Sequence, residues 1–205
     1  MIAILPLLLA QAQPAAAPVV LSADGSEAMR CAATAGALVS SEGEMRVVAA
    51  TSYYVMMAAR SDRGTGPFLL RVQALSPLVA QYAPSYALAP AIAAECRKHV
   101  PLAWTIAPAT LPADPFARDV TCTMAISIMA GGAEVLQKAK GDATYADRYH
   151  AAQKRFEGRM TNAVTIQHGI TTQAQFVVFA GDQLLASLAF GNVSSISATC
   201  EALPL

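Results

Sequence analysis

The strings IAAEC at residues 92–96 and ISATC at residues 196–200 decide the fold, because both follow one pattern, I-x-A-x-C. Each string ends in a cysteine, and each is followed closely by Pro-Leu, at 101–102 and at 204–205. Self-similarity within one chain is the sequence signature of a repeated structural unit. The two strings therefore predict an internal duplication in which the last helix of each copy carries a cysteine.

The other two cysteines lie at matching places near the start of each copy. Cys31 is found in EAMRCAATAGALVSSEGE (27–44), and Cys122 is found in ARDVTCTMAISIMAGGAE (117–134). Both stretches have small and apolar residues at helical spacing, and the second is expected to end near the Gly-Gly pair at 131–132. Each copy is thus predicted to begin with a cysteine-bearing helix.

The even number of cysteines favours two disulfides, which four cysteines can form in three ways. A bond formed inside a single ancestral unit would be inherited twice, and this selects Cys31–Cys96 and Cys122–Cys200. No C-x-x-C pair, haem signature or neighbouring histidine pair is present. We therefore expect no metal and no cofactor.

An all-α fold is predicted, because apolar residues recur at three and four positions and alternating stretches are scarce. The chain is expected to form two tandem four-helix units, each closed by its own disulfide. The expected divisions are a signal peptide at 1–17, helical repeat 1 at 18–102, a proline-rich crossover at 103–113 and helical repeat 2 at 114–205.

Several residues predict where individual helices begin. Asp114 is the expected N-cap ahead of Pro115, and Asn192 is the expected cap of the last helix. Thr144 should cap a helix whose face runs from Tyr145 to Met160, with Gly169 beyond its end. Thr172 begins a stretch with capping-box spacing. In the first copy, helices are expected at 23–40, 44–59, 67–82 with a break before Pro77, and 90–99. Trp104, the only tryptophan, is expected to fill a gap between the halves.

The amino terminus indicates export. MIAILPLLLAQA at residues 1–12 is a short apolar run that ends in a small-x-small triplet, and 15–17 offers a second such triplet, although no Lys or Arg precedes the run. The run is too short to span a bilayer, which needs about 20 apolar residues. We expect cleavage and a periplasmic or secreted protein, which is the kind of compartment where disulfides persist.

Composition limits the classes of partner. Hydrophobic residues make up 55% of the sequence and charged residues 14%, and the formal net charge is zero. A chain with so little charge has no electrostatic means of recruiting nucleic acid. Uncovered apolar surface instead favours a protein partner, an apolar small molecule, a homodimer face or a membrane surface.

The sequence contains none of the motifs G-x-S-x-G, H-E-x-x-H, G-x-x-x-x-G-K-[ST] and G-x-G-x-x-G, and no catalytic residue is assigned. His99, His150 and His168 are the side chains suited to acid-base work near neutral pH. Each also has a structural interpretation: two lie in basic or polar helical stretches, and His168 precedes a C-cap glycine. A non-enzymatic protein is favoured, with a scattered His-centred site as the alternative.

Two groups of residues are candidates for binding. Arg155 and Arg159 lie four apart on one expected helix and suggest an anion or acidic-lipid patch, although acidic residues interleave with them. Met56, Met57 and the adjacent Tyr53 suggest an adaptable apolar groove, for which core packing is the alternative.

An apolar leader followed by a Cys31 helix and a Cys96 helix resembles small exported helical proteins of Gram-negative bacteria that have no assigned function. The resemblance covers about the first copy and implies no activity. Our hypothesis from the sequence is an exported, non-enzymatic helical module that binds a partner protein or an apolar ligand. An enzyme and a peripheral membrane protein are the alternatives.

Overall fold

Residues 21–62, 64 and 66–204 are described by the computed structural model, and every regular element in these ranges is a helix. The prediction of an all-α fold is therefore confirmed for the described residues. The signal peptide expected at 1–17 lies outside them.

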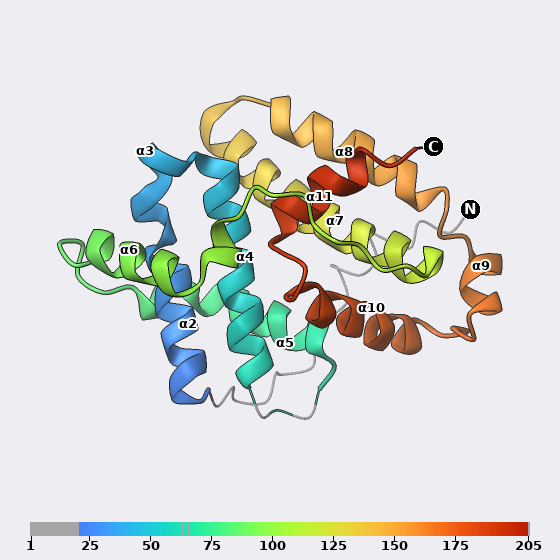
Figure 1. Cartoon of the computed structure of the whole chain (residues 1–205), viewed down its shortest axis with the longest axis horizontal. Coiled ribbons are helices and arrows are strands. Elements are labelled where there is room, and N and C mark those ends of the chain that lie inside the picture. Colours follow the sequence, from blue (N-terminus) through green and yellow to red (C-terminus); the bar gives the residue numbers. More distant parts are fainter. Residues whose placement is uncertain (1–20, 63, 65, 205) are drawn as a thin grey trace.

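The first half of the chain occupies the left of Figure 1, where the long helices α2 and α4 pack against each other. Its elements are α2 (Ala23–Thr34), the 3-10 helix η1 (Ala35–Leu38), α3 (Val39–Glu42), α4 (Glu44–Ser61), α5 (Phe68–Leu75), the 3-10 helix η2 (Ser76–Tyr82) and α6 (Ala89–His99). The expected break before Pro77 appears as the change from α5 to η2. Gly43, with φ at 82°, makes the turn between α3 and α4 in a region that favours glycine.

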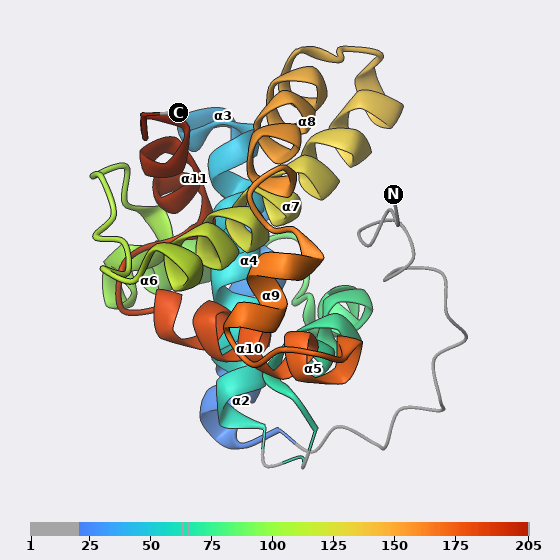
Figure 2. The same cartoon turned by 90° about the vertical axis from the view of Figure 1, so that its right-hand side faces the viewer.

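The second half is built on α7, against which α8, α10 and α11 all pack. Its elements are the 3-10 helix η3 (Pro101–Trp104), α7 (Pro115–Lys140), α8 (Thr144–Glu157), α9 (Asn162–Gln167), α10 (Gln173–Ser187) and α11 (Val193–Glu201). Figure 2 shows α7 and α8 as a pair, with α10 and α5 side by side below them. The contact between α5 and α10 joins the two halves.

Most of the predicted caps are present. The Asp114 carboxylate accepts a hydrogen bond from the backbone N–H of Ala117 at 2.7 Å. Thr172 and Gln175 form both hydrogen bonds of a capping box, and the Asn192 side chain caps α11. These short polar side chains satisfy backbone N–H groups that have no partner inside the helix.

Three local expectations are wrong. Helix α7 continues through the Gly-Gly pair at 131–132 and ends at Lys140, because an interior glycine costs only about 1 kcal/mol and buried neighbours outweigh it. The helix whose expected face runs to Met160 stops at Glu157, and Thr161 caps a separate α9. Thr144 is the first residue of α8 and makes no cap; its hydroxyl donates to Asp142 instead.

Both disulfides have the predicted connectivity. Cys31 is bonded to Cys96 and Cys122 to Cys200, with a Cα–Cα distance of 5.6 Å in each pair. The first bond joins α2 to α6, and the second joins α7 to α11. Two disulfides are compatible with an oxidising compartment outside the cytosol.

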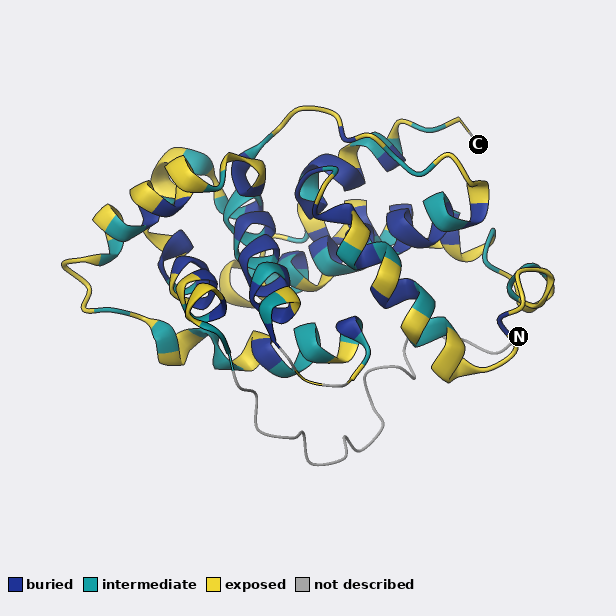
Figure 3. Cartoon of the chain, turned by 60° about the horizontal axis from the view of Figure 1, so that its bottom comes forward, coloured by how far each residue is buried: buried dark blue, intermediate teal, exposed yellow. Residues whose placement is uncertain are grey.

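One hydrophobic core extends through both halves. It includes Met29 and Met56 from the first half and Ile126 and Met129 from the second, all with no exposed surface. In Figure 3 the buried residues, in dark blue, lie along the facing sides of the central helices. A smaller cluster around Phe116 lies where α7, α10 and the segment after α9 meet.

The crossover is tied to both halves. Trp104 is buried, and its indole N–H donates to the Tyr54 hydroxyl of α4 at 3.1 Å. On the other side, the Asn192 amide donates to the backbone carbonyls of Leu102, Ala103 and Thr105. Trp104 is therefore part of the seam between the halves.

Helix α7 is the one described helix that is long and apolar enough to cross a membrane. However, 56% of its most apolar window is buried inside the protein, where α4, α8, α10 and α11 pack around it. Core helices of globular proteins have the same composition.

Candidate functional site

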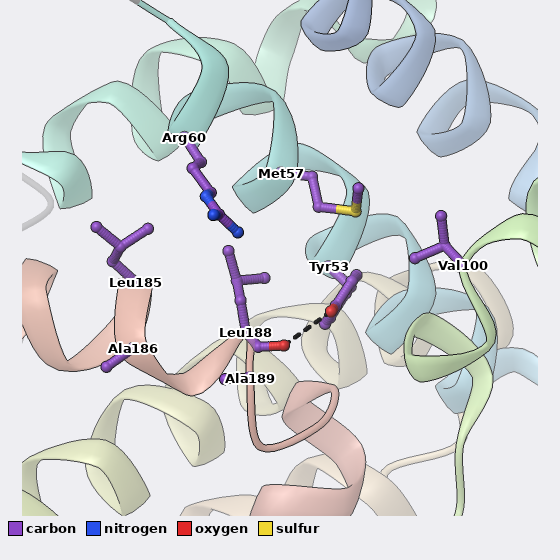
Figure 4. A pocket seen from close by; sticks show the side chains of 8 residues that line it. All are labelled: Tyr53, Met57, Arg60, Val100, Leu185, Ala186, Leu188 and Ala189. Atoms are coloured by element: carbon purple, nitrogen blue, oxygen red, sulfur yellow. Dashed lines mark hydrogen bonds between the residues drawn. The ribbon is translucent and has the colours of Figure 1, made fainter.

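A groove lies at the seam where α4 of the first half meets the end of α10 of the second half, and we call it the seam groove (Figure 4). Its volume is about 410 Å³, within the range of small-molecule sites. It is open to solvent on one side. The residues that line it are Tyr53, Met57, Arg60, Val100, Leu185, Ala186, Leu188 and Ala189.

Helical spacing explains the α4 wall. Tyr53, Met57 and Arg60 are four and three residues apart, and residues at this spacing share one face of a helix. The opposite wall comes from Leu185 and Leu188 at the end of α10. Neither half alone makes the groove, because each supplies one wall.

Tyr53 lines the groove, and its hydroxyl is hydrogen-bonded within the protein. The hydroxyl donates to the backbone carbonyl of Leu188 at 2.8 Å, which ties α4 to the end of α10. Burial raises the pKa of Tyr53, and the positive charge of Arg60 offsets part of this rise. The phenol therefore stays neutral at physiological pH, and the groove gains a largely apolar floor.

Among the residues that the structure describes, Arg60 is the only charged one that lines the seam groove. Its guanidinium reaches toward the space between α4 and α10 in Figure 4, and the residue is exposed. Among the described residues, no carboxylate lies within 4.0 Å of it. The mouth of the groove thus has one positive charge available for a ligand.

The structure brings together two of the three candidates for an apolar groove. Tyr53 and Met57 line the seam groove, whereas Met56 has no exposed surface and belongs to the core. The difference arises because consecutive helical residues point about 100° apart.

The two candidate arginines have partners within the chain. Arg155 donates to the backbone carbonyls of Glu201 and Leu203 at 3.1 Å, so it holds the end of the chain against α8. Arg159 pairs with the largely buried carboxylate of Asp119 at 2.8 Å. These contacts occupy both guanidinium groups with structural hydrogen bonds.

Each of the three histidines has a different neighbour. His150 of α8 contacts the Glu134 carboxylate of α7 at 2.9 Å, and both side chains are more than 40% exposed. His99 lies 3.5 Å from Glu95 on the surface of α6. His168 stacks on Phe116, with ring centroids 4.1 Å apart. None of the three lines the seam groove.

Glu27, Cys31 and Cys96 have ligand atoms within 4.8 Å of one another, which is close enough for a metal site. The two sulfurs are bonded to each other in the disulfide. A cysteine binds a metal ion through its free thiolate, which a disulfide does not provide. The Glu27 carboxylate is then the one remaining ligand of this cluster, so the cluster does not suit a metal ion.

Six lining residues were not singled out by the sequence: Arg60, Val100, Leu185, Ala186, Leu188 and Ala189. Arg60 follows Tyr53 by seven residues on one helix face, so the spacing contained a usable signal. No comparable signal exists for Leu185 and Leu188, because the packing of α10 near α4 is a tertiary contact between distant segments.

The fold and the site define a class: an all-helical protein with two disulfides and a largely apolar groove between its two halves. Comparison of the chain with models of protein families, with curated proteins and with solved structures gives no match. The geometry of the chain itself is therefore the basis of the functional proposal.

Proposed function

We propose that this chain is an exported, non-enzymatic binding module that takes an apolar ligand in the seam groove. The observation that carries the proposal is the groove itself, a space of about 410 Å³ with apolar walls from Met57, Leu185 and Leu188. Small-molecule sites are typically concave, mostly apolar and placed between structural units. The two disulfides support export, because they persist in oxidising compartments.

We also propose that the chain arose by the internal duplication expected from its sequence. In each half the cysteine-bearing first helix packs against a later helix of the same half, as α2 on α4 and as α7 on α8. In each half a disulfide also joins the first helix to the last. We infer that two copies of one helical unit came to face each other and that the groove arose at their junction.

The binding test uses N-phenyl-1-naphthylamine, a neutral apolar dye that fluoresces when it leaves water. We expect saturable binding to the protein, driven by removal of apolar surface from water. Replacing Ala186 of the groove wall, as Ala186→Trp, fills the site and should weaken dye binding at least about tenfold, which corresponds to about 1.4 kcal/mol.

The matched control is Ala174→Trp, which places the same side chain at an exposed position of the same helix, away from the groove. It should bind dye as the unaltered protein does. Equal binding by Ala186→Trp and the unaltered protein, with both folded by circular dichroism, contradicts the assignment of the groove.

A further inference from the structure

Resting on the proposed function, we infer that the ligand of the seam groove is a single-chain carboxylate of the fatty-acid type. Its alkyl chain lies along Met57, Leu185 and Leu188, and its carboxylate binds the Arg60 guanidinium at the mouth.

Arg60 differs from most other arginines in its partners. Arg46 pairs with Glu42 and donates to the Trp104 carbonyl, and Arg148 pairs with Glu201. Arg71 donates to two backbone carbonyls near the end of α4. These cations are occupied by the protein. In the described part of the chain, no side chain or backbone oxygen accepts a hydrogen bond from Arg60, although its guanidinium lies at the groove.

The position of Arg60 matches the shape of an amphiphile. It lies in the last turn of α4, one helical turn beyond Met57, so along α4 the charge follows the apolar part of the wall. The Tyr53 hydroxyl is already used by Leu188 and does not compete for the head group. A ligand with one polar end and one long apolar end satisfies both parts of the groove.

The single charge favours a carboxylate over a phosphate monoester. A guanidinium presents two parallel N–H groups to a planar carboxylate and forms a bidentate, charge-assisted pair. A phosphate monoester carries about −1.5 to −2 charges at neutral pH, which one arginine would not neutralise. A monoanion leaves the occupied groove neutral.

The experiment compares three probes with the same alkyl chain: decanoate, 1-decanol and decylamine. Each displaces the naphthylamine dye from the full chain with both disulfides intact. In the unaltered protein, decanoate should bind about fivefold more tightly than decanol, because an ion pair with the exposed Arg60 guanidinium adds to the apolar contacts that both probes make. Decylamine should bind most weakly, because its ammonium group has the same sign of charge as Arg60. In Arg60→Met, the ratio of decanoate to decanol affinity should fall to about one.

Arg30→Met is the control. It removes a different exposed arginine, which pairs with Glu27 on α2, and it should leave the affinity ratio unchanged. A ratio near one in the unaltered protein, or a ratio that survives in Arg60→Met, overturns the carboxylate inference while dye binding in the groove still stands. If neither the dye nor any of the three amphiphiles binds, both the inference and the proposed function fail.

Discussion

At the scale of single residues, the seam depends on a few polar contacts inside an apolar core. Tyr54 has almost no exposed surface, and its hydroxyl accepts the hydrogen bond from the Trp104 indole. Burial raises the pKa of Tyr54 to about 12, and the hydrogen bond with Trp104 partly opposes this rise. The buried phenol therefore holds its proton more firmly than it would in the unfolded chain.

This raised pKa predicts a loss of stability at alkaline pH. The native pKa lies above the unfolded value of 10.0, so the contribution of Tyr54 is fully present below pH 10 and is lost as the pH rises toward 12. Urea unfolding at neutral pH and at pH of about 11 should show a fall in the free energy of unfolding. The fall should be smaller in Tyr54→Phe.

Tyr53 and Tyr149 also have pKa values raised by burial, so they contribute to the alkaline loss in every variant. Tyr86→Phe is the control, because this side chain is 95% exposed. An alkaline loss that is as large in Tyr54→Phe as in the unaltered protein would show that Tyr54 is not buried as described.

At the scale of helices, α7 of the second half packs closely against α4 of the first half. A Cβ added at Gly132 would lie 2.3 Å from the Val48 Cγ1 atom of α4, whereas one added at Gly131 meets no atom within 4 Å. Val48 is β-branched and has little rotamer freedom with which to move away. The two adjacent glycines of α7 thus have different roles.

We expect the two glycine-to-alanine changes to have opposite effects on stability. Gly131→Ala should raise the free energy of unfolding by up to about 1 kcal/mol, since alanine is the better helix former. Gly132→Ala should lower it by about 1–3 kcal/mol through overpacking. Thermal and urea unfolding of both variants measures this, and Val48→Ala should relieve the loss in Gly132→Ala. Equal effects of the two changes would contradict the close crossing.

Local sequence signals predicted how helices begin better than how they end. The caps at Asp114, Thr172 and Asn192 were predictable because each needs only a side chain within three residues. The continuation of α7 through Gly131 and Gly132 was not, because contacts of α7 with α4 and α8 support it.

For the candidate site, Tyr53 and Met57 could be proposed from residue type alone, but their spacing with Arg60 was the missed signal. The α10 wall could not be predicted, because it depends on how two distant segments pack.

At the scale of the whole molecule, the two disulfides and the shared core make different contributions. The bridges close loops of 65 and 78 residues, and the chain-entropy model gives about 4 kcal/mol of stabilisation for each. The core includes residues of both halves, so the halves should unfold together.

Removing either bridge should therefore lower stability without separating the halves. The double variants Cys31→Ala/Cys96→Ala and Cys122→Ala/Cys200→Ala should each lose up to about 4 kcal/mol in free energy of unfolding. Each should still unfold in one cooperative step when followed by both Trp104 fluorescence and circular dichroism. Two separate transitions in the unaltered protein would contradict a shared core.

The central claim is that the seam groove is the binding site, and methyl NMR of the methionines tests it most directly. Met57 lines the groove, whereas Met29, Met56 and Met129 are buried in the core with no exposed surface. On titration with N-phenyl-1-naphthylamine, we predict that the Met57 methyl signal shifts and saturates while the three core signals stay near their starting positions. A saturating titration that leaves the Met57 signal unmoved would place the ligand elsewhere and contradict the account.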